Sequence, residues 1–124
     1  MRLRQIDGTF AVAQLSADAD VPPWAHGPAP TAVIRTEDEL TIVCDATRVP
    51  HGVNAQKEWA CFRSIGPFAF DEAGILASLV TPISDRGIGV FVLCTFDGEH
   101  IFCPTTMFED VRKTLEEQGH VFDA

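Results

Sequence analysis

The sequence predicts an α+β fold whose second half has the ferredoxin-like βαββαβ order of elements. Two observations indicate this. From residue 59 onward, apolar spacings typical of strands and helices alternate as strand, helix, strand, strand, helix and strand. The first half is rich in β-type segments and has almost no helical periodicity. We therefore expect two lobes in tandem: a degenerate, strand-rich N-terminal lobe over 1–57 and a complete unit over 58–124.

The first half contains three segments with β-type composition. Residues 9–15, 31–35 and 40–44 are each predicted to form a strand, and the acidic residues 36–39 form the turn between the last two. The proline-rich connection over 21–28 has room for one helical turn at most. Pro50, Gly52 and Asn54 mark the boundary between the halves.

The second half opens with a predicted strand over 59–65, followed by a helix. Apolar residues recur there at helical spacing, namely Ile75, Leu76, Leu79, Val80 and Ile83. Asp71 is a suitable N-cap, and Gly87 is placed to end the helix. Pro82 is expected to kink this helix or to confine regular α-helical geometry to the residues before it.

A hairpin and a second helix complete the unit. The strands 88–96 and 99–103 flank Asp97-Gly98, a pair preferred in two-residue type I′ turns, which would pair Phe96 with Glu99 and Thr95 with His100. Residues 106–109 have the spacing of a capping box. The helix that follows should turn its apolar face inward and end at Gly119, before a short strand over 120–122. Its inward residues are Phe108, Val111 and Leu115.

Composition excludes several partners. The chain has 124 residues and a formal net charge of −9, with a pI near 4.6. Nucleic acid and anionic membrane surfaces are therefore not expected partners, because both require clustered Lys and Arg. The longest apolar run, 88–94, is too short to span a bilayer, and no apolar segment typical of a signal peptide follows the basic N-terminal residues, so we expect a cytoplasmic protein. The four cysteines lie in predicted strands and are expected to be reduced core residues: Cys44, Cys61, Cys94 and Cys103.

Two acidic turns are the strongest candidate site. Asp71 and Glu72 precede the first helix, and Asp97 and Glu99 lie in the hairpin. Free N–H groups at the helix N-terminus can take a ligand carboxylate, while side-chain carboxylates can take an ammonium or guanidinium group. Gly74 would let a ligand approach the backbone. Together these groups describe a pocket for an amino acid.

Other interpretations of the same residues remain open. Asp71 can be only an N-cap, Asp97 only a turn residue and Glu99 only a charge that protects a sheet edge. A zinc site is the weaker alternative, because strand alternation places His100 on the face opposite Cys94 and Cys103. The same separation, and the absence of a G-x-S-x-G or phosphate-binding loop, leave enzymatic activity unsupported.

The two turns also resemble a family pattern. The segment 70–75, Phe-Asp-Glu-Ala-Gly-Ile, and the segments 88–91 and 94–100 are similar to motifs of the ACT domain family, specifically small bacterial tandem-ACT proteins related to the arginine sensor CASTOR. Segments 8–13, 24–25 and 39–44 extend the resemblance over nearly the whole chain.

The resemblance implies an ACT-like lobe in each half and an amino acid or related metabolite bound between ACT domains. The residues that fall on ligand-lining positions are Glu72, Gly74, Ile75, Thr95, Phe96 and Glu99. It also implies a regulatory, non-enzymatic homodimer that pairs through its sheets and needs no cofactor; a structural dimerisation module with a vestigial pocket is the alternative. Glu99 stands where the family has Asp, and Cys94 where Ser is common, so the pocket size and the ligand are expected to differ.

Overall fold

The computed structural model describes residues 1–66 and 73–123. The chain divides into two compact units. Met1–Asp7 and Ala60–Ala124 form the first, here called the helical unit, and Gly8–Trp59 form the second, here called the strand unit. Strands β1 (Arg2–Leu15) and β4 (Ala55–Ser64) each contribute residues to both units. A degenerate ACT-like lobe over 1–57 stays a prediction.

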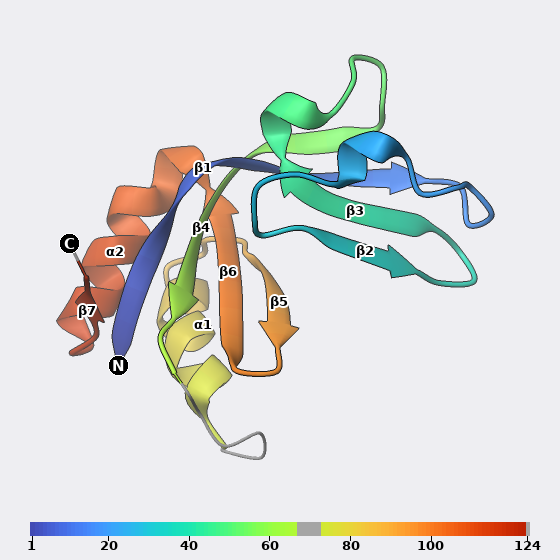
Figure 1. Ribbon diagram of the computed structural model, residues 1–124. Coiled ribbons are helices and arrows are strands. Elements are labelled where there is room, and N and C mark those ends of the chain that lie inside the picture. The colour runs from blue at the N-terminus through green and yellow to red at the C-terminus, as the bar shows by residue number, and fades with distance from the viewer. Residues whose placement is uncertain (67–72, 124) are drawn as a thin grey trace. The chain divides into compact units, whose positions relative to one another are not determined.

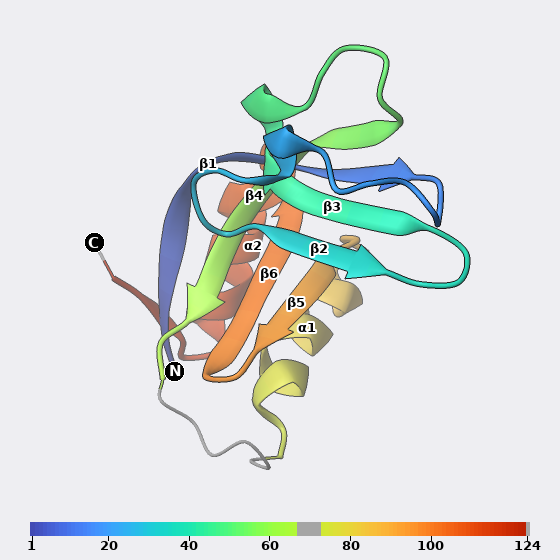
Figure 2. The ribbon, with the colours of Figure 1, turned by 45° about the vertical axis from the view of Figure 1, so that its right-hand side comes forward.

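The helical unit has the predicted α+β architecture. Its sheet contains parts of β1 and β4 together with three further strands, in the order β7-β1-β4-β6-β5. Figures 1 and 2 show both helices on one face of this sheet. The remaining elements are α1 (Ile75–Asp85), β5 (Phe91–Thr95), β6 (Gly98–Pro104), α2 (Phe108–Glu117) and β7 (Val121–Phe122).

The first residues of β1 were not predicted to be a strand. Arg2 and Leu3 pair in parallel with Val121 and Phe122 of β7, and the Ile65 N–H donates to the Arg2 carbonyl oxygen at 3.0 Å. The four-stranded antiparallel sheet of a ferredoxin-like unit would contain only β4, β5, β6 and β7. Here β1 lies between β7 and β4 as an additional strand, and its pairing with β7 is parallel. Residues 2–5 are mostly polar and lack the apolar alternation of a half-buried strand, so only pairing with distant residues determines their conformation.

An apolar core joins the helices to the sheet. Leu79 and Ile83 of α1 are fully buried, and so are Val111 and Leu115 of α2, which confirms the helical spacing found in the sequence. The sheet contributes buried side chains from each of its central strands, among them Leu3, Phe62, Ile101 and Cys103. Burial of these faces, at about 25 cal/mol per Å² of apolar area, holds the helices on the sheet.

The ends of the helices differ from the prediction. Helix α1 begins at Ile75 after Gly74, which is the N-cap residue and has φ +84; Asp71 lies outside the described residues. The helix also continues past Pro82 to Asp85, so regular geometry is not confined to the residues before the proline. Helix α2 follows a 3₁₀ turn, and its N-cap residue, Met107, makes no side-chain capping bond, so the predicted capping box does not form.

The strand unit follows the sequence prediction closely. Strands β2 (Ala32–Arg35) and β3 (Leu40–Asp45) are antiparallel, and β3 pairs with the second part of β1. The proline-rich connection forms the single turn Pro23–Ala25. A small core lies within this unit, formed by Ala11, Ala25, Leu40, Ile42, Cys44 and Val49.

No helix within residues 1–66 and 73–123 has the length and apolar character needed to cross a membrane. The four cysteines are all free thiols and all lie in strands. Cys44, Cys61 and Cys103 are buried as expected, but Cys94 is exposed. The expectation of a core position is wrong for Cys94 because β5 is the last strand in the sheet order, so fewer neighbours cover it.

Candidate functional site

The predicted site residues fall on two segments of the helical unit. Gly74 and Ile75 begin α1, and Thr95, Phe96, Asp97 and Glu99 belong to the β5–β6 hairpin. Asp71 and Glu72 lie outside the described residues. The structure therefore describes six of the eight predicted residues.

Glu99 is held in place by Ser64, a residue that the sequence analysis did not single out. The Ser64 hydroxyl donates to Glu99 Oε2 at 2.7 Å and accepts the Glu99 backbone N–H at 3.0 Å. Ser64 is fully buried and Glu99 is half-buried. Ser64 follows Ala60 and Phe62 at alternate positions of β4, so a polar residue in an otherwise inward-facing row was the signal that could have identified it.

The hairpin has a different register from the predicted one. Thr95 pairs with Gly98, Cys94 with Glu99 and Leu93 with His100, so the two loop residues are Phe96 and Asp97. The predicted pairing of Phe96 with Glu99 is wrong: the turn lies one residue earlier, so the partner of Glu99 lies two residues earlier, at Cys94. Because this shift is an even number of residues, Cys94 and His100 still lie on opposite faces.

Gly98 explains this shift. It is absent from the residues of positive φ, so it is not the second residue of a type I′ turn. It is buried instead, and a Cβ atom there would lie 2.9 Å from Ser64 Oγ. Glycine is therefore required for close approach to β4, and Gly98 belongs to the strand and not to the turn.

The turn itself is exposed. The Thr95 hydroxyl donates to the Gly98 carbonyl oxygen at 3.1 Å, which closes the hairpin. Phe96 is 79% exposed although it is a large aromatic residue.

Asp97 lines a pocket with two arginines. The pocket has a volume of about 470 Å³ and is lined by Arg4, Arg63, Ile65, Gly66 and Asp97, all of the helical unit. It brings the hairpin turn, the first part of β1 and the end of β4 together. Neither arginine was predicted to belong to the site.

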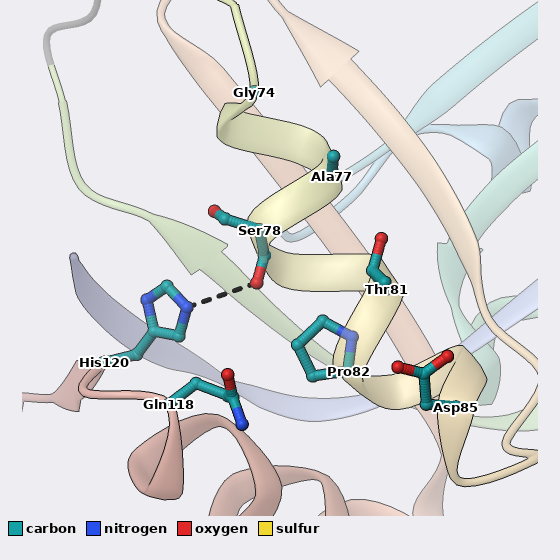
Figure 3. A pocket seen from close by; sticks show the side chains of 8 residues that line it. All are labelled: Gly74, Ala77, Ser78, Thr81, Pro82, Asp85, Gln118 and His120. Carbon is teal, nitrogen blue, oxygen red and sulfur yellow. Dashed lines mark hydrogen bonds between the residues drawn. The ribbon is translucent and has the colours of Figure 1, made fainter.

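Gly74 lines a second pocket, of about 570 Å³, beside α1. Figure 3 shows its lining: α1 and its N-cap residue provide Gly74, Ala77, Ser78, Thr81, Pro82 and Asp85, and the segment after α2 provides Gln118 and His120. Because Gly74 has a left-handed φ and open space around its Cβ position, its backbone conformation is the reason for glycine here.

His120 in this pocket compensates for Pro82. Proline lacks the N–H that would bond to the carbonyl four residues earlier, which is that of Ser78. His120 Nε2 lies 3.2 Å from this carbonyl oxygen and can donate to it, as Figure 3 shows. Burial lowers the pKa of His120, whereas the bond to Ser78 acts in the opposite direction. His120 therefore interacts with the backbone of α1 and is not simply solvated.

We expect Pro82→Ala to raise the free energy of unfolding by about 1 kcal/mol. This is less than the ~3 kcal/mol cost of proline in a helix interior, because His120 already satisfies the freed carbonyl. In the parent protein, His120→Ala should cost about 0.5–1.5 kcal/mol, and in the Pro82→Ala background much less. Urea unfolding of the four variants measures this coupling; equal effects of His120→Ala in both backgrounds would disprove it.

Metal and thiol chemistry find no support in the described residues. Within 1–66 and 73–123 no three His, Cys, Asp or Glu side chains form a group that could hold a metal ion. Burial raises the pKa of the Cys61 thiol to about 12 and that of Cys103 to about 11, so both are protonated at neutral pH. A protonated, buried thiol is a poor nucleophile.

The fold defines the class of protein as a small α+β domain of the ACT-like kind. The ACT domain family model matches residues 54–117, and a model of an N-terminal domain matches residues 8–52. The chain belongs to the ACT domain family. No curated protein matches it.

Solved structures support the same assignment. The protein Atu0741 from Agobacterium tumefaciens is 41% identical, with a TM-score of 0.93 over 98% of this chain and 91% of that one. A protein of unknown function from Vibrio cholerae, VC0802, described as a possible transport protein, has 17% identity and a TM-score of 0.73 over 94% and 88% of the two chains. The regulatory subunit of aspartate kinase from Thermus thermophilus, at 6% identity, has a TM-score of 0.63 over 90% and 93%. The last two similarities concern the fold alone.

Proposed function

We propose that this protein is a non-enzymatic regulatory sensor that binds an amino acid or a related metabolite. Its membership of the ACT family and the regulatory role of the Thermus thermophilus protein of similar fold support a regulatory binding function. The observation that carries the proposal is the fixed carboxylate of Glu99. The proposed lining comprises Asp71, Glu72, Gly74, Ile75, Thr95, Phe96, Asp97 and Glu99. The resemblance to CASTOR-related proteins suggests all of these except Asp71 and Asp97, which belong to the two acidic turns.

Glu99 is prepared to accept a cationic group. Ser64 holds its Oε2, whereas Oε1 makes no hydrogen bond with the rest of the described chain. A half-buried carboxylate that is already oriented loses little side-chain entropy when it binds an ammonium or guanidinium group. The free N–H groups at the start of α1 are suitable donors to an anionic group.

The assembly and the compartment also belong to this proposal. Strands β2 and β5 end the sheet order, and β2 exposes Val33 and Ile34, each at 43%. Such an edge suits pairing with a second copy of the chain, and sedimentation equilibrium would show a dimer that Val33→Lys converts to a monomer. We place the protein in the cytoplasm because its four thiols are free.

A thermal-shift panel of the twenty amino acids tests the proposal. A ligand at a hundredfold excess over its Kd stabilises the protein by about 2.7 kcal/mol, which raises Tm by several degrees. Glu99→Gln keeps a group that can bond to Ser64 but removes the charge, so we expect it to weaken binding about tenfold or more. Glu109→Gln, an exposed position on α2, is the matched control and should bind like the parent protein. If no amino acid changes Tm, the structural dimerisation module becomes the better account.

A further inference from the structure

The pocket at the end of β4 concentrates positive charge in an acidic protein. The chain carries 9 Lys and Arg against 18 Asp and Glu. Within the described residues the ion pairs involve Arg2, Arg86 and Arg112. Arg4 and Arg63 take part in none of them, yet both line this pocket. Two guanidinium groups without a carboxylate at ion-pair distance, in a chain with so many carboxylates, indicate a site for an anion from outside.

The arginines lie on the sheet face opposite the helices. Leu3 and Phe62 point into the core beneath α1 and α2. Because strand residues alternate between faces, their neighbours Arg4 and Arg63 point to the other side. Arg63 Nε donates to the Ser64 carbonyl oxygen at 3.0 Å, which fixes the side chain and leaves its two terminal amino groups without a partner in the described chain. The pocket thus has one anchored and one exposed guanidinium.

His100 lies beside this pair of arginines. It is half-buried on the same face, and its Nδ1 atom is buried without a hydrogen-bond partner among the described residues. Burial lowers the pKa of His100, and the charges of Arg63 and Arg4 lower it further, against a smaller opposite effect of Glu99. Both guanidinium groups are therefore close enough to affect the ring, and a lowered pKa keeps the ring neutral at pH 7.

We propose that this pocket binds the carboxylate of an amino-acid ligand through Arg4 and Arg63, with Asp97 beside them to accept the ligand's ammonium group. The inference rests on the proposed function and adds side-chain donors for the ligand's carboxylate to the backbone N–H groups at the start of α1. Two guanidinium groups suit the planar, bidentate geometry of a carboxylate. The volume of about 470 Å³ suits a small metabolite.

Calorimetric titrations test this inference. The probes are the amino acid that most stabilises the parent protein in the thermal-shift panel and the amine formed from it by decarboxylation. The parent protein should bind the amino acid at least about tenfold more tightly than the amine. Arg63→Gln and Arg4→Gln should each remove most of this preference. Arg86→Gln is the matched control, because Arg86 is exposed and pairs with Glu117 away from the pocket.

Further measurements make the result decisive. Circular dichroism and Tm of each variant show that it is folded, and Arg63→Lys, which keeps the charge, should keep part of the preference. In NMR spectra the His100 ring should shift when the amino acid binds to the parent protein. If the amino acid binds and both glutamine variants keep the preference for the carboxylate, this inference is wrong, while the proposed function stands. If no amino acid binds the parent protein, both are wrong.

Discussion

Phe62→Ala is expected to lower the free energy of unfolding by about 3–5 kcal/mol, the largest effect of any single substitution considered for this chain. Phe62 is fully buried in the helical unit. Its ring lies 5.5 Å from that of Phe122 and 6.4 Å from that of Phe108, and these two rings are 6.1 Å apart. The substitution would leave a cavity where β4, α2 and β7 meet, and it would remove two aromatic contacts worth about 0.5–1.5 kcal/mol each.

The matched control is Phe96→Ala at the exposed hairpin tip. It removes the same atoms from a side chain that is 79% exposed, so we expect a change well below about 1 kcal/mol. Urea unfolding followed by circular dichroism measures both variants. Similar losses at the two positions would contradict the assignment of Phe62 to the core that connects β4 with α2.

Gly98→Ala is expected to destabilise the protein by about 1–3 kcal/mol, the cost of overpacking. The added methyl group would lie 2.9 Å from Ser64 Oγ and would displace the hydroxyl that holds Glu99. Ser64→Ala, which removes two hydrogen bonds, one of them to a charged group, should cost a similar amount. These two effects have a common origin, the contact between β4 and the hairpin.

The double variant Ser64→Ala/Gly98→Ala distinguishes a steric requirement for glycine at position 98 from a requirement of the turn conformation. Ser64→Ala removes the atom that Gly98→Ala would strike, so the double variant should lose clearly less stability than the sum of the two single variants. Additive losses would mean that Gly98 is needed for its backbone conformation alone. Glu99 should also bind ligand less well in each variant, because its carboxylate is no longer oriented.

Local patterns were sufficient to predict most of the helical unit. Leu79 and Ile83, and likewise Val111 and Leu115, are buried as their spacing indicates, because helical periodicity depends only on near neighbours in the chain. The hairpin register could not be obtained in this way. Asp97-Gly98 is a strong local signal for a turn, but contact with Ser64, more than thirty residues earlier, makes Gly98 a strand residue.

In the candidate site, too, local sequence patterns predicted some residues, and only long-range contacts explain the others. Its hairpin residues could be proposed from the sequence because acidic residues near glycines are visible there. The sequence did not indicate Ser64, Arg4 or Arg63, because only the pairing of β1, β4 and β6 brings these residues to the hairpin. The role of His120 required the three-dimensional structure as well, because its partner is the Ser78 carbonyl, which Pro82 leaves without a helical hydrogen bond.

Backbone-amide NMR with the stabilising amino acid tests the central claim, ligand binding by the ACT domain, most directly. A chain of 13.5 kDa is well suited to two-dimensional ¹H–¹⁵N spectra. We predict saturable shifts concentrated at Gly74, Ile75 and residues 95–99, with weaker shifts or none in Glu99→Gln. Shifts confined to the strand unit, or no shift with any of the twenty amino acids, would contradict the account.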